Sequence, residues 1–381
     1  MKLTFDADVE AFRAEFLDWL AANRPSPEEM AADPPLSSAH VPVWAGRWVR
    51  RLFDAGWLVP GWPRELGGRN AGPVETLVYQ EELTKADVPR TTNPQGLGII
   101  APSILDYGNA QQIRDYAMPI LRGERAACLG MSEPGAGSDL ASLSTRAVLD
   151  GDQFVINGQK VWTSGANYAD FCFLFCRTDP SAPKHKGISV VLVEMDTPGI
   201  TVRPLPEIVD PEHPDLNEVF LSDVVVPAEN LVGKLNDGWA MASGSLAHER
   251  GMVWLSAVQH LEASMREVLA EAPEALERLP ADERAVATDH LVQSYVDSVA
   301  ARCLGYRGFA KLVRGGSAPE QALMKAFSSE SSQRLALAAS ESIGGRWRER
   351  YLGTFASTIS AGSSEIQRNI IAEKVLGLPR G

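Results

Sequence analysis

The chain has 381 residues, of which 45% are hydrophobic and 22% are charged, and these ordinary globular values exclude wholesale disorder. Its formal net charge of −13 disfavours nucleic-acid binding, because an acidic surface repels phosphate backbones. No apolar run approaches the ~20 residues needed to cross a bilayer, so we expect no membrane span.

Residues 1–125 are predicted to form a helical domain. Val9, Phe12, Phe16 and Trp19 recur at helical spacing and so define one apolar face. Further helical patterns continue to about residue 121.

Residues 126–233 are predicted to form a small β domain. Asp150–Asp152 and Asn157-Gly158 are strong turn signals between short strands. Phe171–Phe175 and Ile188–Val193 are apolar and are predicted to be strands. Short strands at such close intervals are typical of a small barrel or sandwich.

Residues 234–381 return to helical patterns. Three long helices are expected between residues 239 and 342, interrupted near Pro273 and Pro280, and a short one is expected over residues 364–375. The predicted fold class is therefore α+β, with a helical domain, a small β domain and a second helical domain in that order.

The cysteines favour a reducing compartment. Cys128, Cys172, Cys176 and Cys303 form no CxxC pair, so buried thiols are expected and not disulfides or a metal site. Residues 1–6 include no apolar segment typical of a signal peptide. We therefore expect a cytoplasmic protein without a bound metal.

Two segments of the β domain carry the candidate chemistry. Met131–Asp139 reads Met-Ser-Glu-Pro-Gly-Ala-Gly-Ser-Asp, and Val161–Ala166 places Trp162 among hydroxyl side chains. The first segment is either a turn between strands or part of a site. It is not a P-loop, since no Gly-Lys-Ser/Thr follows, and not a Rossmann fingerprint, since strands follow it. Trp162 is either part of the core or an aromatic wall beside a flat ligand.

Together with two further motifs, these segments resemble those of the acyl-CoA dehydrogenase family. Pro63–Gly68 resembles the family's Pro-x-Glu-x-Gly-Gly element, and Ser364–Arg368 resembles its Ser-x-Ile-Gln-Arg. The resemblance covers nearly the whole chain. It implies a helical domain, a β-barrel domain and a C-terminal four-helix domain, with FAD between the last two. The implied reaction removes a proton from Cα and a hydride from Cβ of an acyl thioester, giving a trans-2-enoyl thioester.

The resemblance also implies site residues. To the cofactor it assigns Met131, Ser132, Trp162, Ser164, Gly344, Gly345 and Ser363, and to the substrate Ser138, Arg250 and Ala361. Trp162 would pack on the flavin, and the Ser164 hydroxyl would contact its N5 atom. The family usually has Thr where Ser132 and Ser164 stand, so the hydroxyl is kept and the methyl is lost.

The expected base is Glu249. Ala361 stands where many family members carry the catalytic Glu, and alanine cannot take a proton. A minority, including branched-chain and long-chain types, place the base immediately before an Arg on a helix, as Glu249 and Arg250 do here. Glu249 shares a helix face with apolar residues, so it is either this base or half of an ion pair. Glu365 is expected to be a first-turn acid at a helix N-terminus.

The resemblance implies partners as well. The substrate would be a branched, bulky or medium-to-long acyl group on CoA or on an acyl-carrier protein, and an electron-transfer flavoprotein or similar protein would accept the electrons. A homo-oligomer, a dimer or a tetramer, is expected, with a hetero-oligomer as the alternative. The family's Arg-x-x-Phe-Gly element is missing, and Glu341 stands where a Gln commonly faces the flavin pyrophosphate. Two other activities stay open: a non-catalytic partner subunit, and a flavin monooxygenase or oxidase.

Overall fold

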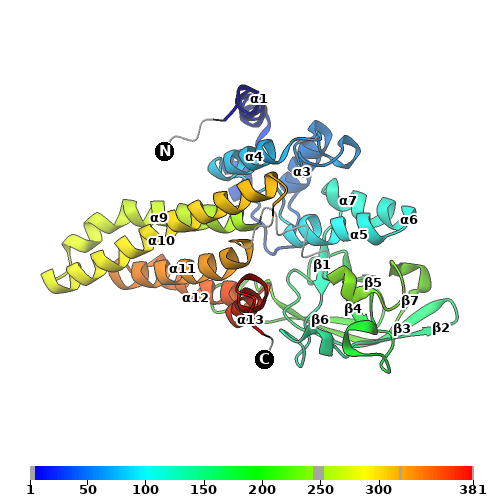
Figure 1. Ribbon diagram of the computed structural model, residues 1–381. Helices are drawn as coiled ribbons and strands as arrows, with labels where there is room; N and C mark the ends of the chain where they lie inside the picture. The colour runs from blue at the N-terminus through cyan, green and yellow to red at the C-terminus, as the bar shows by residue number, and fades with distance from the viewer. Residues whose placement is uncertain (1–4, 243–252, 317–319, 380–381) are drawn as a thin grey trace. The chain divides into compact units, whose positions relative to one another are not determined.

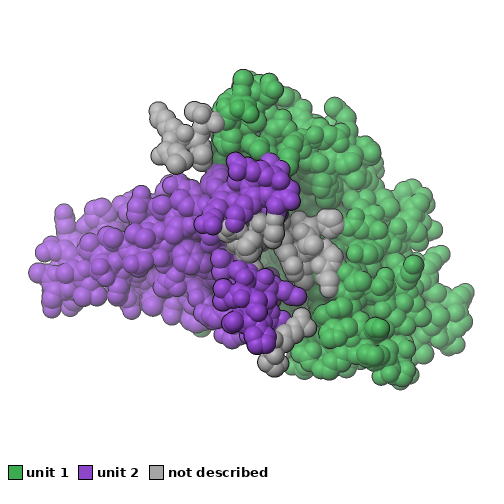
Figure 2. Space-filling model, in the orientation of Figure 1, with its two compact units in different colours: residues 1–249 green, residues 250–381 purple. Residues whose placement is uncertain are grey.

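Helices, strands and helices follow one another along the chain, as predicted (Figure 1). The computed structural model describes residues 5–242, 253–316 and 320–379. By their contacts the residues divide into two compact units, 1–249 and 250–381 (Figure 2). The α+β class is confirmed, whereas the domain boundaries at residues 125 and 233 stay a prediction. No helix among the described residues is long and apolar enough to span a membrane.

Amphipathic helices open the first unit. They are α1 (Ala7–Asn23), α2 (Pro27–Ala32), α3 (Val43–Ala55), α4 (Pro73–Lys85), α5 (Ala101–Tyr107), α6 (Ala110–Gln112) and α7 (Met118–Leu121), with π-helical turns η2 (Gly96–Ile100) and η3 (Ile113–Ala117). In α3, Trp48 and Leu52 lie on the buried face. The helix ends at Gly56, whose φ of 76° lets its N–H bond back to the last turn.

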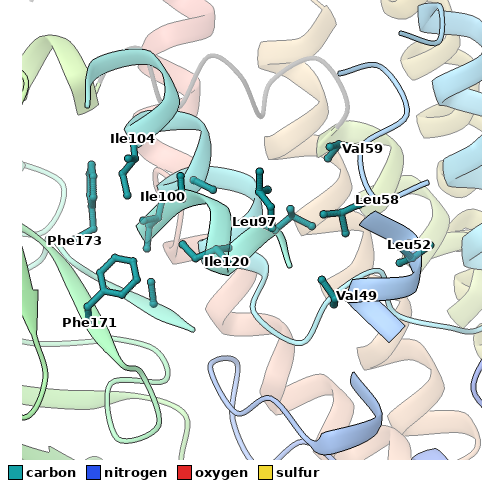
Figure 3. Packing of buried hydrophobic residues seen from close by; sticks show 14 of the residues in the cluster. Val49, Leu52, Leu58, Val59, Leu97, Ile100, Ile104, Ile120, Phe171 and Phe173 are labelled. Carbon is teal, nitrogen blue, oxygen red and sulfur yellow. The ribbon is translucent and has the colours of Figure 1, made fainter. Parts of the chain in front are cut away.

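These helices and the sheet share one hydrophobic core. Phe16, Trp48 and Tyr79 are fully buried, and the rings of Phe16 and Tyr79 are 4.6 Å apart. The same cluster continues into Phe171 and Phe173 of the sheet (Figure 3). The first 125 residues therefore pack as one unit with the β domain.

The β domain is a sheet of eight strands. They are β1 (Ala127–Gly130), β2 (Arg146–Asp150), β3 (Gln153–Lys160), β4 (Phe171–Arg177), β5 (Ile188–Glu194), β6 (Ile200–Pro204), β7 (Asn217–Pro227) and β8 (Leu231–Val232). Their order is β6-β7-β3-β2-β4-β5-β8, and β1 runs parallel to β4. The two apolar strands predicted from sequence are confirmed as β4 and β5.

One of the two predicted turns is wrong. Gly151 and Asp152 join β2 to β3 in a tight hairpin, as expected, since Asp150 pairs with Gln153. Asn157-Gly158 lies inside β3, where the register with β7 shifts between Ile156 and Gly158. A Cβ at Gly158 would come within 2.7 Å of the Thr145 backbone, so the glycine serves a bulge and a close approach.

The second unit is helical. It contains α9 (Val253–Glu277), α10 (Ala281–Val313), α11 (Glu320–Ser342), α12 (Arg346–Ile359), α13 (Ser364–Ile370) and the π-helical turn η7 (Ile371–Val375). The predicted interruption at Pro273 is wrong, because α9 continues through it. Leu269, whose carbonyl loses its helical partner, is 50% exposed, so water can hydrate that carbonyl. The break at Pro280 is confirmed, since this residue precedes α10.

The cysteines are all free. Cys128, Cys172 and Cys176 are buried, as expected for core thiols. Cys303 is exposed, which corrects the expectation that all four thiols are buried. It lies on α10, on the part of that helix that is exposed.

Gly68 provides a test of the packing around α3. A Cβ at this position would lie 2.0 Å from the carbonyl oxygen of Trp62, and backbone atoms cannot move aside cheaply. Gly68→Ala should lower the free energy of unfolding by about 3 kcal/mol, measured by urea denaturation. Gly135→Ala is the control, because a Cβ there meets nothing within 4 Å. Equal stability of the two variants would contradict this account.

Candidate functional site

The two motif segments of the β domain lie side by side. Met131 and Ser132 directly follow β1, and both are half-buried. The Ser132 carbonyl accepts a 2.9 Å hydrogen bond from the N–H of Val161, the residue after β3. The structure therefore joins segments that are about thirty positions apart in sequence.

A buried ion pair lies beneath this junction. The ammonium of Lys160 is 2.9 Å from Oε1 of Glu133, and the two side chains are 0% and 4% exposed. Lys160 Nζ also donates to the Met131 carbonyl at 3.1 Å. Glu133 accepts further hydrogen bonds from the N–H groups of Ser144 and Thr145 and from the Ser144 hydroxyl. The carboxylate is therefore fully satisfied, as a buried charge must be.

The electrostatics of Glu133 reflect these contacts. Burial by itself would raise the pKa of its carboxyl, but the Lys160 charge and the hydrogen bonds outweigh burial and lower that pKa to about 2. Glu133 is thus ionised throughout the physiological range. The pair was not predicted from the sequence, although Glu133 lies within the first motif segment and Lys160 directly precedes the second.

Trp162 is exposed and is not part of the core. Its backbone has a φ of 59°, the left-handed region that non-glycine residues rarely adopt, and its side chain is 61% exposed. A large apolar ring that is held in a strained backbone and left uncovered is typical of a binding surface. Of the two interpretations of this residue, the structure favours the aromatic wall.

The segment that carries Trp162 is clamped from the start of β7. The Thr163 N–H donates to the Asn217 carbonyl at 3.0 Å, and the Asn217 side chain donates back to the Thr163 carbonyl at 3.2 Å. The Gly165 N–H donates to the Asp215 carbonyl at 2.8 Å, and the Asp215 carboxylate accepts from the Ser37 hydroxyl. Sequence analysis missed Asp215 and Asn217, whose only signal was polarity at the start of a strand.

The polar groups around Trp162 have capacity for a ligand. Within the described residues, the hydroxyls of Ser132 and Ser164 have no hydrogen-bond partner, and neither does the Ser132 N–H. The Thr163 hydroxyl is buried and also lacks a partner among them. A flat aromatic surface bordered by unpaired donors fits a ring with polar edges, which is what the flavin of FAD presents. Ser138 is exposed in the loop that follows Glu133.

The remaining predicted residues belong to the second unit. Gly344 and Gly345 have φ values of 78° and 57° in the turn between α11 and α12. The Ser363 hydroxyl caps α13 by accepting from the Ile366 N–H at 3.4 Å. Ala361 has a φ of 52°, an unusual conformation for alanine.

Glu365 lies in the first turn of α13, as expected. Backbone hydrogen bonding and the Ser363 side chain lower the pKa of this exposed carboxyl. Glu249 and Arg250, the predicted base and its neighbour, lie outside the described residues.

A hollow in the second unit is acidic. It measures about 340 Å³ and lies between the start of α10 and the end of α11. Its lining residues include the acidic Asp282, Glu283 and Glu341, together with His290 and Leu279. Among the described residues, no group of three or more His, Cys, Asp or Glu side chains could hold a metal ion.

Comparisons with known proteins cover the whole chain. Family models match residues 6–124 (acyl-CoA dehydrogenase, N-terminal domain), 128–224 (middle domain) and 236–376 (C-terminal domain). Acyl-CoA dehydrogenase IpdE1 of Mycobacterium tuberculosis is 38% identical over 98% of each chain.

Two solved structures resemble this chain over its full length. The Tcur3481-Tcur3483 steroid ACAD matches all of both chains with 30% identity and a TM-score of 0.82. The ChsE4-ChsE5 complex from Mycobacterium tuberculosis also matches all of both chains, with 30% identity and a TM-score of 0.81. At 30% identity, both structures resemble this chain in sequence as well as in fold.

The Glu133 carboxyl predicts a pH dependence of stability. Its pKa falls from 4.5 in the unfolded chain to about 2 on folding, so its contribution is complete above pH 4.5 and is lost as the pH falls towards 2. Between pH 5 and pH 2 the unmutated protein should lose about 3 kcal/mol more unfolding free energy than Glu133→Gln. Urea denaturation at several pH values measures this difference. Parallel pH profiles for the two proteins would contradict the ion pair.

Proposed function

Since the chain belongs to the acyl-CoA dehydrogenase family, we propose that it catalyses the FAD-dependent α,β-dehydrogenation of a bulky acyl-CoA thioester. The observation that carries this proposal is the exposed, left-handed Trp162 clamped beside Ser132 and its unpaired donors. A partner subunit without a flavin site of its own would have no need of this arrangement.

Residues of the first unit would hold the cofactor ring. Trp162 offers its exposed face for stacking, and Ser132 and Ser164 offer hydroxyl donors. When bound, FAD supplies the two-electron acceptor for the hydride that leaves Cβ. Gly344, Gly345 and Ser363 of the second unit are proposed to contact the same cofactor. Ser138 is proposed to meet the pantetheine arm, which CoA and acyl-carrier proteins share.

Glu249 is the proposed base. It would take the proton from Cα, and its carboxylate fits this role because the position used by many relatives is Ala361. The backbone N–H of Ala361 persists and is proposed to polarise the thioester carbonyl, as an oxyanion-hole donor does. Arg250 is proposed to lie near the substrate. An alanine at position 361 also removes the bulk of a glutamate side chain, which suits a branched or ring-bearing acyl group.

A steroid-derived acyl thioester is the proposed substrate class. A solved structure similar to this chain over its full length is named a steroid ACAD. The replacement of a glutamate side chain by the methyl group of Ala361 agrees with this class, since a fused ring system needs the added space. An electron-transfer flavoprotein is the proposed electron acceptor.

An assembly with a second, related subunit is proposed for the same protein. Asp282, Glu283 and Glu341 make the hollow of the second unit negative, and a negative hollow repels a dinucleotide pyrophosphate. By resemblance, this region would otherwise receive a neighbour's FAD. A similar solved structure is the ChsE4-ChsE5 complex, whose two names support the same asymmetry.

Glu249→Gln tests the base. The amide keeps the shape of the side chain but cannot accept the proton, so anaerobic bleaching of bound flavin by substrate should slow by ~10²–10⁴. The FAD content should stay near normal, because the carboxylate does not hold the ring. Stopped-flow absorbance measures the rate.

Glu365→Gln is the matched control, because Glu365 is an exposed carboxylate in the first turn of α13 and takes no part in the proposed chemistry. If Glu249→Gln bleaches as fast as the unmutated protein and Glu365→Gln does not, the assignment of the base is wrong. Rapid reoxidation of the reduced flavin by O₂ would instead favour an oxidase.

The acidic hollow predicts a gain in cofactor affinity when its charges are removed. Asp282→Asn, Glu283→Gln and Glu341→Gln combined should strengthen FAD binding by this chain alone by up to ~100-fold at low salt, because each of the three charges costs about 1 kcal/mol when it lies about 4 Å from a phosphate in water. The gain should shrink as salt rises. Fluorescence titration with FAD measures it, and an unchanged affinity would argue for a symmetric homo-oligomer.

A further inference from the structure

One buried charge of the first unit has no role in the mechanism above. Lys160 is the last residue of β3, and its side chain is 0% exposed, although lysine is among the residues least often buried. Burying an ammonium is costly, and a methionine of similar length would avoid the cost. Its position therefore calls for an explanation beyond packing.

The contacts of Lys160 with Glu133 and Met131 lie directly beneath the proposed flavin surface. Its ammonium bonds Glu133 at 2.9 Å and the Met131 carbonyl at 3.1 Å. The next residue, Val161, donates its N–H to the Ser132 carbonyl at 2.9 Å. Lys160 thus holds Met131 and Ser132 against the end of β3, the strand that leads into Trp162.

The bond to Met131 also has an electrical consequence. The Met131 carbonyl and the Ser132 N–H belong to the same peptide group. A cation on the carbonyl oxygen polarises that group and makes its N–H a stronger donor. The Ser132 N–H has no acceptor within the described part of the chain, so this strengthened donor is available to a ligand.

We propose that Lys160 is a positioning residue that tunes the bound flavin through the Met131–Ser132 peptide group. This inference rests on the proposed function, since it takes the ligand at Ser132 to be the flavin. A stronger donor at the ring edge favours the electron-rich, reduced form. Lys160 therefore raises the reduction potential of the flavin, and Glu133, the counter-charge, moderates this effect while it keeps the ammonium buried.

The test compares the flavin midpoint potential in Lys160→Met and in Glu133→Gln. Lys160→Met removes the cation and should shift the reduction equilibrium at least tenfold towards the oxidised form, which is about 30 mV for a two-electron couple. Glu133→Gln removes the anion, and its potential is measured down to low pH, because burial lowers the pKa of Lys160 and Glu133 is the group that raises it. At the low-pH end, where the ammonium persists, this variant should shift the potential in the opposite direction. Equilibration with a reference dye measures both without any acyl substrate.

The opposite signs separate tuning from a merely structural role. If the pair only supports the fold, both variants should shift the potential in the same direction or leave it within twofold of the unmutated equilibrium, and the inference would be overturned. Should Lys160→Met fail to fold, the direction of the shift in Glu133→Gln still decides. Lys184→Met is the matched control, because it breaks the 2.8 Å pair with Asp139, in which both side chains are 60% exposed, and should change nothing.

The same experiments keep the two proposals apart. If the unmutated protein holds FAD but no acyl-CoA ester bleaches that flavin, the proposed function is contradicted. The dye measurement still tests the role of Lys160 in that case. Bleaching by an ester together with unmoved potentials in both variants would overturn the role of Lys160 alone. Protein that takes up no FAD even when Asp282→Asn, Glu283→Gln and Glu341→Gln are combined would overturn both.

Discussion

The ion pair between Lys160 and Glu133 is the constraint on which the candidate site depends. It is buried, and each partner hydrogen-bonds backbone of a different segment. A buried pair of this kind tolerates little change in geometry, because a displaced partner leaves an uncompensated charge. It therefore fixes Ser132 relative to the strand that ends beside Trp162, and the clamp from Asn217 fixes the residues that follow.

This rigidity explains how a strained residue can persist at the surface. Trp162 has a left-handed backbone and an exposed ring, and neither would be stable in a mobile loop. The backbone hydrogen bonds of Val161, Thr163 and Gly165 fix the backbone on both sides of Trp162. Binding energy then need not be spent on ordering the loop, because the surface is formed before a ligand arrives.

Sequence patterns predicted the order of the elements and the two motif segments, since both depend on local signals. They failed where tertiary contacts decide. Gly158 has the signal of a turn but serves a bulge against Thr145, and Pro273 has the signal of a break but stays within a helix. Asn217 was invisible as a site residue because its role comes from pairing with a residue 54 positions away. The assignment of Glu249 as the base rests on the family resemblance and on the alanine at position 361.

The most direct measurement of the central claim is amide hydrogen exchange in the FAD-free protein, compared between the site segments and an exposed loop. If the ion pair and the clamp preform the surface, the N–H groups of Val161, Thr163 and Gly165 should exchange as slowly as those inside β3. The N–H of Ser181, which bonds only to the exposed side chain of Asp179, serves as the fast reference. Exchange at Val161 and Thr163 as fast as at Ser181 would show that the surface forms only with a ligand, and would contradict the account.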